Sequence, residues 1–344
     1  MNEAVIVSTA RTPIGKAYKG AFNNTHGATL AGHAVQKAVE ASGIDPETVE
    51  DCLMGCAMPE GATGGNIARQ IAIRGGLPVT TAGATINRFC SSGMQAITMA
   101  AQRIMANELD VCIAGGLESI SLVQNEHQNN FMAQESWINQ NKPELYYTMI
   151  QTAEVVSKRY NISREEQDAY GLQSQQRMAN AQKLGYLDKE IFSLETTKLI
   201  KNKETNEITQ ETVCLNKDEG NRPNTDIEGL KSLKPVLGDD AFITAGNASQ
   251  LSDGASACVV MNSKKAEKLN LEPLGAFRGM SVSGLEPDEM GIGPIYAIPK
   301  LLKRHNLNMD NIDLWELNEA FAVQVIYCRD KLGIPNEILN VNGG

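Results

Sequence analysis

Hydrophobic and polar positions in the first 120 residues alternate between short apolar runs and helical periodicity. Four apolar runs predict strands, at residues 4–8, 49–55, 83–87 and 111–114. Apolar residues spaced three and four apart predict a helix over residues 29–42, and Gly43 is placed to end it. A second helix is predicted over residues 94–105. Strands that alternate with helices predict an α/β fold with a mostly parallel sheet under covering helices.

The pattern changes between residues 121 and 243, where Gln, Asn, Lys and Glu become frequent. Helices are predicted over residues 152–160 and 165–184. Residues 198–221 are polar and predict a solvated loop or a small ribbon. The apolar α/β pattern returns at Phe242, so the polar stretch is interpreted as an insertion or subdomain.

The two ends of the chain resemble each other. Residues 34–55 read AVQKAVEASGIDPETVEDCLMG, and residues 297–318 read AIPKLLKRHNLNMDNIDLWELN. Both predict a helix, a turn with an acidic residue and a short strand, at an offset of 297 − 34 = 263 residues. Identity is low, so two ordinary α/β units are the alternative. A true repeat implies two related halves with the polar insertion between them.

Charge and cysteine usage narrow the class of protein. At a formal net charge of −10, nucleic acid and anionic membrane are disfavoured as main partners, although a few local Lys and Arg side chains can still hold phosphates. The seven cysteines show no metal-type spacing, so we expect free thiols in a reducing compartment and no metal site. No leader and no apolar run of roughly 18 residues is visible, which favours a cytoplasmic protein without a membrane span.

The strongest local chemical signal is the segment NRFCSSGMQA at residues 87–96. A predicted strand leads into a turn of small residues, and Cys90 then stands at the start of an amphipathic helix. Free N–H groups and the positive end of the helix dipole favour a thiolate there. Gly93 and the two serines leave room for a substrate carbonyl against the backbone. A lone cysteine is more often structural, but this position predicts a nucleophile.

The segment NRFCSSGMQA is similar to the nucleophile segment of thiolases, and further landmarks follow in the order that this family shows. They are VIVSTARTPIGK at 5–16, NIARQIAIRGGLP at 66–78, GGLES at 115–119, TAGNASQLSDGASA at 244–257 and WELNEAFA at 315–322. The second resembles the stretch that thiolases use at their subunit interface. The chain is therefore identified by resemblance as a member of the thiolase family over its whole length.

The resemblance implies a duplicated, layered α-β-α-β-α fold with an inserted polar loop domain. The expected N-terminal half comprises residues 1–120 and 244–272, and the loop domain comprises residues 121–243. The expected C-terminal half comprises residues 273–344. A homodimer or homotetramer is implied as the assembly.

The resemblance also implies the reaction. Thiolases move an acyl group between a cysteine and coenzyme A (CoA), either cleaving 3-oxoacyl-CoA or condensing acetyl-CoA to acetoacetyl-CoA. Cys90 would form the acyl-enzyme, which divides a hard carbon–carbon step into two easier ones. Asn318 of the NEAF motif would hold a water that stabilises a developing oxyanion. Acyl-CoA and CoA are the implied partners, and CoA would be a co-substrate with no bound cofactor.

Further residues are assigned to substrate binding by the same resemblance. Ser249 would hydrogen-bond the pantetheine chain. Arg222 lies where the family often places a basic side chain near the nucleotide, and a solvated surface Arg is the alternative. Leu237 would contact adenine or pantetheine unless it packs in the core. The remaining assignments are Met149, Ala245, Ala320 and Phe321.

Two departures from the family pattern bear on the chemistry. Thiolases specialised for acetoacetyl-CoA often carry His-Met-Gly before the TAE at 152–154, whereas this chain has TMI at 148–150, which counts against strict acetoacetyl-CoA specificity. The Asn-Arg pair before Phe89 and Cys90, and Arg222-Pro223 followed by LKSLKP at 230–235, resemble degradative or broad-range thiolases. The family's Gly-His-Pro base and second catalytic cysteine follow a segment that resembles NVNGG at 340–344. The chain as printed is therefore expected to lack both and to be inactive without them. None of its four histidines lies in a motif that pairs with Cys90.

Two other interpretations remain open at this point. A decarboxylating condensing enzyme of the same broad fold also uses a cysteine, but the NEAF motif argues against it. A non-catalytic CoA-binding or scaffold protein of thiolase fold belongs to a different functional class.

Overall fold

The structure is a computed structural model that describes residues 2–344. The chain divides into two compact units. Unit 1 comprises Met1–Asn129, Leu187–Gly220 and Leu251–Arg278, and unit 2 comprises Asn130–Tyr186, Asn221–Gln250 and Gly279–Gly344. The three-part division expected from the sequence stays a prediction.

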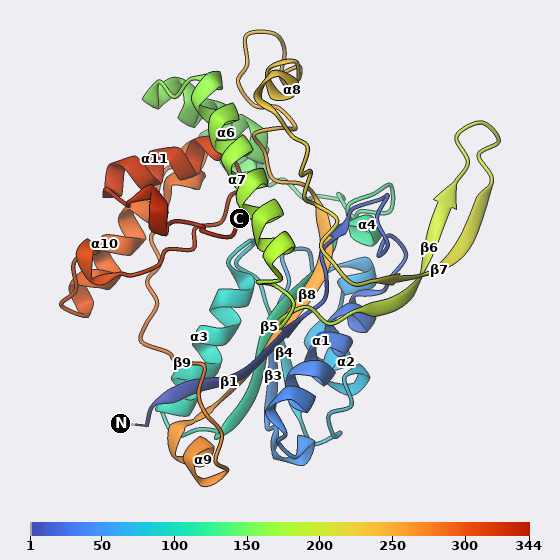
Figure 1. Ribbon diagram of the computed structural model, residues 1–344, viewed down its shortest axis with the longest axis vertical. Coiled ribbons are helices and arrows are strands. Elements are labelled where there is room, and N and C mark those ends of the chain that lie inside the picture. The colour runs from blue at the N-terminus through green and yellow to red at the C-terminus, as the bar shows by residue number, and fades with distance from the viewer. Residues whose placement is uncertain (1) are drawn as a thin grey trace. The chain divides into compact units, whose positions relative to one another are not determined.

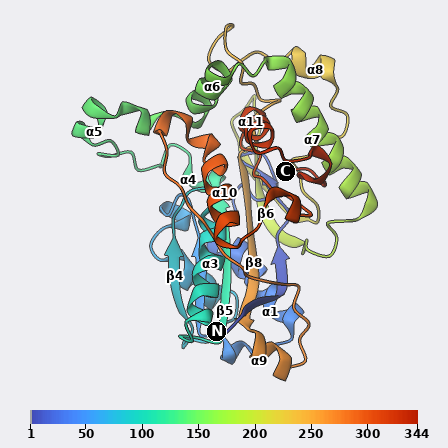
Figure 2. The same ribbon diagram turned by 90° about the vertical axis from the view of Figure 1, so that its left-hand side faces the viewer.

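Within residues 2–344, unit 1 forms a seven-stranded sheet in the order β4-β3-β5-β8-β1-β9, with β2 paired to β8 (Figures 1 and 2). The strands are β1 (Ala4–Arg11), β2 (Gly15–Lys16), β3 (Asp51–Gly55), β4 (Ala82–Ile86), β5 (Val111–Ser119), β8 (Ser252–Asn262) and β9 (Gly275–Ala276). β3 pairs parallel with β4 and β5, whereas β8 pairs antiparallel with β5 and β1. The prediction of a mostly parallel sheet is therefore corrected to a mixed sheet, because β8 inserts between strands that share one direction.

Helices cover both faces of this sheet. The helices of unit 1 are α1 (Gly27–Ser42), α2 (Ile67–Arg74), α3 (Ser92–Met105), α4 (Ile120–Val123) and α9 (Ser263–Lys268), with 3-10 helices η1 (Pro46–Thr48) and η2 (Gly61–Thr63). α1 and α2 lie on one face and α3 lies on the other (Figure 1). In β8, Val259 and Met261 join the apolar cluster beneath α1 and α2, whereas Cys258 and Val260 join the cluster beneath α3. This period of two is expected for a strand buried on both faces.

Two local features of unit 1 follow the sequence prediction. Gly43 has a φ of 68° and its N–H bonds to the carbonyls of Val39 and Glu40, so it ends α1 as a left-handed cap. The polar stretch forms an antiparallel ribbon of β6 (Leu194–Lys201) and β7 (Ile208–Leu215), which extends away from the sheet in Figure 1. The prediction of a small ribbon is confirmed.

Unit 2 is mainly helical in the described residues. Its helices are α5 (Ser136–Asn141), α6 (Met149–Tyr160), α7 (Arg164–Leu184), α8 (Ile227–Lys231), α10 (Pro294–Arg304) and α11 (Ala322–Leu332), with 3-10 helices η3 (Pro143–Tyr146), η4 (Pro287–Ile292), η5 (Met309–Asn311) and η6 (Asn336–Ile338). Its core packs Val323 and Ile326 of α11 with Val156 of α6 and Tyr170 of α7. The predicted helices at 152–160 and 165–184 are confirmed as α6 and α7.

The two segments that resemble each other in sequence have a similar order of elements, which fits either a repeat or two ordinary α/β units. In unit 1, α1 is followed by η1 and β3, and in unit 2, α10 is followed by η5, which starts at 46 + 263 = 309. The strand predicted next in the second copy is reduced to one parallel bridge between Trp315 and Leu339. Leu317 lies two residues after Trp315. Its backbone pairs with the amide side chain of Asn340 and not with the backbone of a strand.

Candidate active site

Cys90 lies on an exposed turn between β4 and α3 in unit 1. The residue before it, Phe89, has a φ of 45°, in the left-handed region that favours glycine. Such a backbone conformation costs about 1–3 kcal/mol and persists only where the surroundings fix it. The turn presents Cys90 at the strand-to-helix junction that the sequence predicts.

Hydrogen bonds hold this strained turn in place. Asn87 Oδ1 accepts a hydrogen bond from Phe89 N at 2.8 Å, and Asn87 Nδ2 donates to Ala57 O at 3.0 Å. Ser92 Oγ accepts from Arg88 N at 2.8 Å and donates to Phe89 O at 2.6 Å. Ser92 is buried, so its two bonds are partly protected from water, whereas the two bonds of Asn87 are exposed. The polar residues on both sides of Cys90 therefore fix the backbone that carries it.

The helix α3 begins at Ser92, two residues after Cys90. Its N-cap residue, Ser91, makes no side-chain capping hydrogen bond. The first N–H groups of a helix lack intrahelical acceptors, and the helix dipole is positive at this end. At this helix the N–H groups of Ser91 and Ser92 donate to Arg88 O and Phe89 O, at 3.0 Å each. The N–H groups of the next two residues, Gly93 and Met94, are therefore the ones suited to stabilise a thiolate, or a carbonyl oxygen that becomes negative.

Glycines allow the sheet to approach the start of α3. A Cβ added to Gly55 at the end of β3 would lie 2.3 Å from the Ser92 carbonyl carbon and 2.4 Å from Gly93 N. A Cβ on Gly116 of β5 would lie 3.4 Å from the Gly93 Cα. The start of α3 thus rests on sheet backbone, which explains small residues at these positions.

Replacing Gly55 with alanine is expected to displace the start of α3 and the Cys90 turn. Overpacking of this kind costs about 1–3 kcal/mol, and misplacement of the nucleophile should slow acylation of Cys90 about tenfold or more. The matched control is Gly275→Ala, because nothing lies within 4 Å of a Cβ at Gly275. Thermal denaturation and the acylation rate check both variants, and equal behaviour of the two would contradict the prediction.

The other cysteines differ from Cys90 in exposure. Burial raises the pKa of Cys258 and Cys328 to about 12. Burial, and then the nearby Glu118 carboxylate, raise the pKa of Cys56 to about 12 as well. Thiols of this kind stay protonated at neutral pH and are poor nucleophiles. Among the described residues, only Cys90 and Cys214 are exposed cysteines, and Cys214 lies on the β6–β7 ribbon rather than at a helix start.

Two segments that the sequence analysis singled out lie side by side in unit 2. They are the loop at residues 244–249 and the NEAF segment. Ser249 N donates to Ala320 O at 3.0 Å, and Ala322 N donates to Asn247 O at 2.9 Å. These backbone bonds join the two segments in a short strand-like pair, although they are some 70 residues apart in sequence.

The side chains of these segments differ in accessibility. Ala245, Ser249 and Asn318 are exposed, and Ala320 is half-buried. Phe321 is only 7% exposed and packs in the core of unit 2. Its side chain therefore anchors the NEAF segment to the core of unit 2, and its role in substrate binding stays a prediction.

The remaining assignments also fall in unit 2. Arg222 is exposed, and its backbone N–H donates to Gln175 Oε1 at 2.7 Å. Gln175 and Ser249 both line a pocket between α7 and the 244–249 loop, so the segment of Arg222 borders the same region. Met149 begins α6 and Leu237 is half exposed. The binding roles of all these residues stay predictions that rest on the resemblance.

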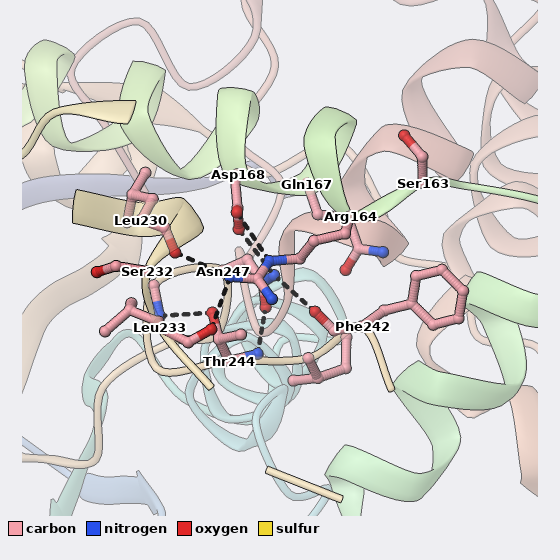
Figure 3. Close-up of polar contacts among 12 residues, drawn as sticks. Ser163, Arg164, Gln167, Asp168, Leu230, Ser232, Leu233, Phe242, Thr244 and Asn247 are labelled. Atoms are coloured by element: carbon pink, nitrogen blue, oxygen red, sulfur yellow. Dashed lines mark hydrogen bonds and ion pairs between the residues drawn. The ribbon is translucent and has the colours of Figure 1, made fainter. Parts of the chain in front are cut away.

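Buried polar contacts hold the loop that carries Ser249 (Figure 3). Asn247 Nδ2 donates to Asp168 Oδ1 at 3.1 Å and to Phe242 O at 3.0 Å, and Asn247 Oδ1 accepts from Thr244 N at 2.8 Å. Asp168 is fully buried and pairs with Arg164 Nε at 2.7 Å. One side chain, Asn247, thus fixes the start of the loop against α7.

Arg164 extends this network to α8. Its Nη2 donates to Leu230 O at 2.8 Å and to Leu233 O at 3.0 Å. Sequence reasoning gave no role to Arg164, Asp168 or Asn247. The only available signal was the four-residue spacing between Arg164, just before the predicted helix at 165–184, and Asp168 inside it, and such spacing is common on solvated surfaces.

Two general features of the described residues bear on the class of protein. Within residues 2–344, no helix has both the length and the apolar character needed to cross a bilayer. In the same residues, no three His, Cys, Asp or Glu side chains are grouped so that they could hold a metal ion.

Comparison with known proteins identifies the family. Residues 4–264 match Thiolase, N-terminal domain, and residues 271–344 match Thiolase, C-terminal domain. The chain is 42% identical over 344 residues to 3-ketoacyl-CoA thiolase of Bacillus subtilis (strain 168), covering 100% of this chain and 87% of that protein. It is 39% identical over 343 residues to peroxisomal 3-ketoacyl-CoA thiolase B of Mus musculus, covering 100% of this chain and 79% of that protein.

Solved structures give the same result. The structure of Bacillus anthracis acetyl-CoA acetyltransferase matches with a TM-score of 0.87 at 36% identity, and that of human mitochondrial 3-ketoacyl-CoA thiolase matches with a TM-score of 0.87 at 34% identity. Each match covers 100% of this chain and 86% of the other.

A layered α/β fold and an exposed cysteine on a strained strand-to-helix turn fit a covalent acyltransferase. The chain belongs to the thiolase family. The thiolase-like α/β fold expected from the sequence is thereby confirmed.

Proposed function

We propose that this protein transfers acyl groups between Cys90 and CoA, cleaving 3-oxoacyl-CoA to acyl-CoA and acetyl-CoA or condensing acetyl-CoA in reverse. The observation that carries the proposal is the exposed Cys90 on its strained turn at the start of α3. The relatives named 3-ketoacyl-CoA thiolase support it, at 42% and 39% identity over the chain.

The reaction divides into two steps. The Cys90 thiolate attacks the 3-oxo carbon, the bond between carbons 2 and 3 breaks, and its electron pair takes up a proton at carbon 2 as acetyl-CoA leaves. Cys90 then holds the shortened acyl group as a thioester. The thiol of a second CoA attacks this carbonyl, gives up its proton, and releases acyl-CoA together with the Cys90 thiolate. Both attacks place negative charge on a carbonyl oxygen, which fixed donors stabilise.

The residues of unit 2 would bind CoA in this proposal. Ser249 would hydrogen-bond pantetheine, and its exposure next to the NEAF segment supports that role. Asn318, also exposed, would hold the water that donates to one oxyanion. The other contacts proposed are Met149, Arg222, Leu237, Ala245, Ala320 and Phe321.

The substrate class proposed is 3-oxoacyl-CoA of more than one chain length, in the degradative direction. TMI at 148–150 in place of His-Met-Gly supports this, and so do the names of the two curated relatives. Steady-state rates on 3-oxoacyl-CoAs of increasing chain length test it. Activity confined to acetoacetyl-CoA would contradict the proposed range.

The acyl-enzyme itself provides the test of function. Full-length protein, expressed from its complete gene, is mixed with acetyl-CoA and analysed by intact mass and peptide mapping. We expect one acetyl group on Cys90, which disappears when free CoA is added. Folded protein that binds CoA but never carries acetyl on Cys90 would contradict the proposal and favour a non-catalytic CoA-binding protein.

We also propose that the protein is a homodimer or homotetramer in the cytoplasm. Ile73 of α2 and Val79 just after it are 47% and 79% exposed, within and beside the stretch that resembles the family's subunit interface. Free thiols on the surface, Cys90 and Cys214, suit a reducing compartment. Molar mass measured by light scattering tests the assembly, and cell fractionation tests the location.

A further inference from the structure

The side chain of Asn340 holds the backbone just before Asn318. Asn340 is fully buried. Its Oδ1 accepts from Leu317 N at 2.8 Å, and its Nδ2 donates to Leu317 O at 2.7 Å. One amide side chain thus makes the pair of hydrogen bonds that a neighbouring strand would make. Asn340 N also donates to Trp315 O at 2.9 Å, which fixes the same segment two residues earlier.

The same side chain holds the residue just after Asn318. Asn340 Nδ2 donates its second proton to Glu319 Oε1 at 2.8 Å. The Glu319 carboxylate also accepts from Tyr170 Oη at 2.9 Å and from Ser174 Oγ, both on α7. Both donor protons of the Asn340 amide are therefore used, one on each side of Asn318.

A third side chain fixes Asn318 from α11. Gln324 Nε2 donates to Asn318 O at 3.3 Å, and Gln324 Oε1 accepts from Phe321 N at 3.1 Å. Gln324 is buried. The NEAF segment is thus held by buried side chains at the backbone of Leu317 and Asn318 and at the carboxylate of Glu319.

This support matters because residues 317–319 belong to no helix or strand. The side chain of Asn318 is exposed and has no regular ladder to set its direction. An oxyanion donor acts through preorganisation, and a shift of about 1 Å can cost on the order of 10²-fold in rate. Residues that orient Asn318 should therefore affect the rate without touching substrate.

We propose that Asn340 is the positioning residue for Asn318: its one amide group holds both neighbours of Asn318 and so sets the direction of the Asn318 side chain. Glu319 acts in the same network as the anchor to α7. The proposal rests on the function proposed above, in which Asn318 holds a water that donates to an oxyanion. It adds a residue that acts only through Asn318.

A double-mutant cycle on the full-length protein tests this. We expect Asn340→Ala to lower kcat for thiolysis about 10- to 100-fold, with the KM for CoA within about threefold of wild type. In an Asn318→Ala background, Asn340→Ala should have little further effect, because the residue that it orients is gone. The matched control is Asn336→Ala in the same segment, since Asn336 Oδ1 accepts only from Arg329 among the described contacts, at 3.3 Å. It should leave kcat unchanged.

The possible outcomes separate this proposal from the proposed function. If Asn340→Ala slows the Asn318→Ala enzyme by the same factor as wild type, Asn340 acts elsewhere and the proposal is overturned. If Asn318→Ala keeps the wild-type rate while Cys90 is still acylated, the water-holding role of Asn318 is wrong and this proposal falls with it, although acyl transfer stands. If Asn340→Ala does not fold, the cycle is repeated with the isosteric Asn340→Asp. That variant keeps an acceptor for Leu317 N but loses both N–H donors. If its effect on kcat adds to that of Asn318→Ala, the proposal is overturned in the same way.

Discussion

Replacing Cys90 with serine should lower the rate of thiolysis by about 10³-fold or more, because a hydroxyl at this position cannot supply the thiolate that attacks the 3-oxo carbon. Serine keeps the size and polarity of the turn residue, and Cys90 is exposed, so the fold should be unaffected. The rate is measured by separating the CoA esters after reaction of the full-length protein with a 3-oxoacyl-CoA. The acetyl adduct expected in the wild-type protein should be absent, in mass spectra of this variant, from the peptide that contains residue 90.

The matched control is Cys214→Ser, which removes the other exposed cysteine of the described residues. Cys214 lies on the β6–β7 ribbon, away from a helix start, so this variant should keep the wild-type rate. A Cys90→Ser protein that retained more than about a tenth of the activity would show that another nucleophile is used. The buried thiols are unsuitable, since burial raises the pKa of Cys258 and Cys328 to about 12.

Much of the fold could be predicted because its signals are local. α1, α6 and α7 follow apolar spacing or helix-favouring composition, and Gly43 ends α1 because a left-handed residue is required there. The order of strands in the sheet could not be predicted in this way. β8 inserts between β5 and β1 through pairings such as Cys112 with Val260, which join residues far apart in sequence. Apolar runs do not specify which strands pair or in which direction.

The residues of the candidate site also divide into those with a local sequence signal and those without one. Cys90, Ser249 and Asn318 lie in contiguous motifs, so the sequence alone indicates them. Asp168 and Asn340 were missed because their roles come from partners that are distant in sequence. Asp168 contacts Asn247 across 79 residues, and Asn340 contacts Leu317 across 23. A buried polar residue in a helix, or just after a 3-10 helix, has the same sequence appearance as a solvated one until its partners are known.

Replacing Asp168 with alanine should destabilise unit 2 by about 3–5 kcal/mol, because it breaks a buried ion pair and leaves one partner uncompensated. Asp168 is fully buried, and its loss removes the acceptors of Arg164 Nε and of Asn247 Nδ2. At about 2–4 °C per kcal/mol for a unit of this size, the midpoint of its thermal unfolding should fall by about 10 °C. The 244–249 loop should also loosen, which would raise the KM for CoA through Ser249.

Two comparison variants identify the cause of that loss. Glu228→Ala removes an exposed ion pair with Lys231 on α8 and should leave the midpoint unchanged, because surface pairs contribute little. The double variant Arg164→Met with Asp168→Leu removes both charges and should recover a large part of the lost stability, since apolar side chains of similar volume often replace a buried pair without loss. If Asp168→Ala unfolds at the wild-type temperature, the buried pair does not stabilise unit 2. If the double variant is less stable than Asp168→Ala, the hydrogen bonds of Arg164 to Leu230 and Leu233 contribute more to the stability of unit 2 than the unpaired charge costs it.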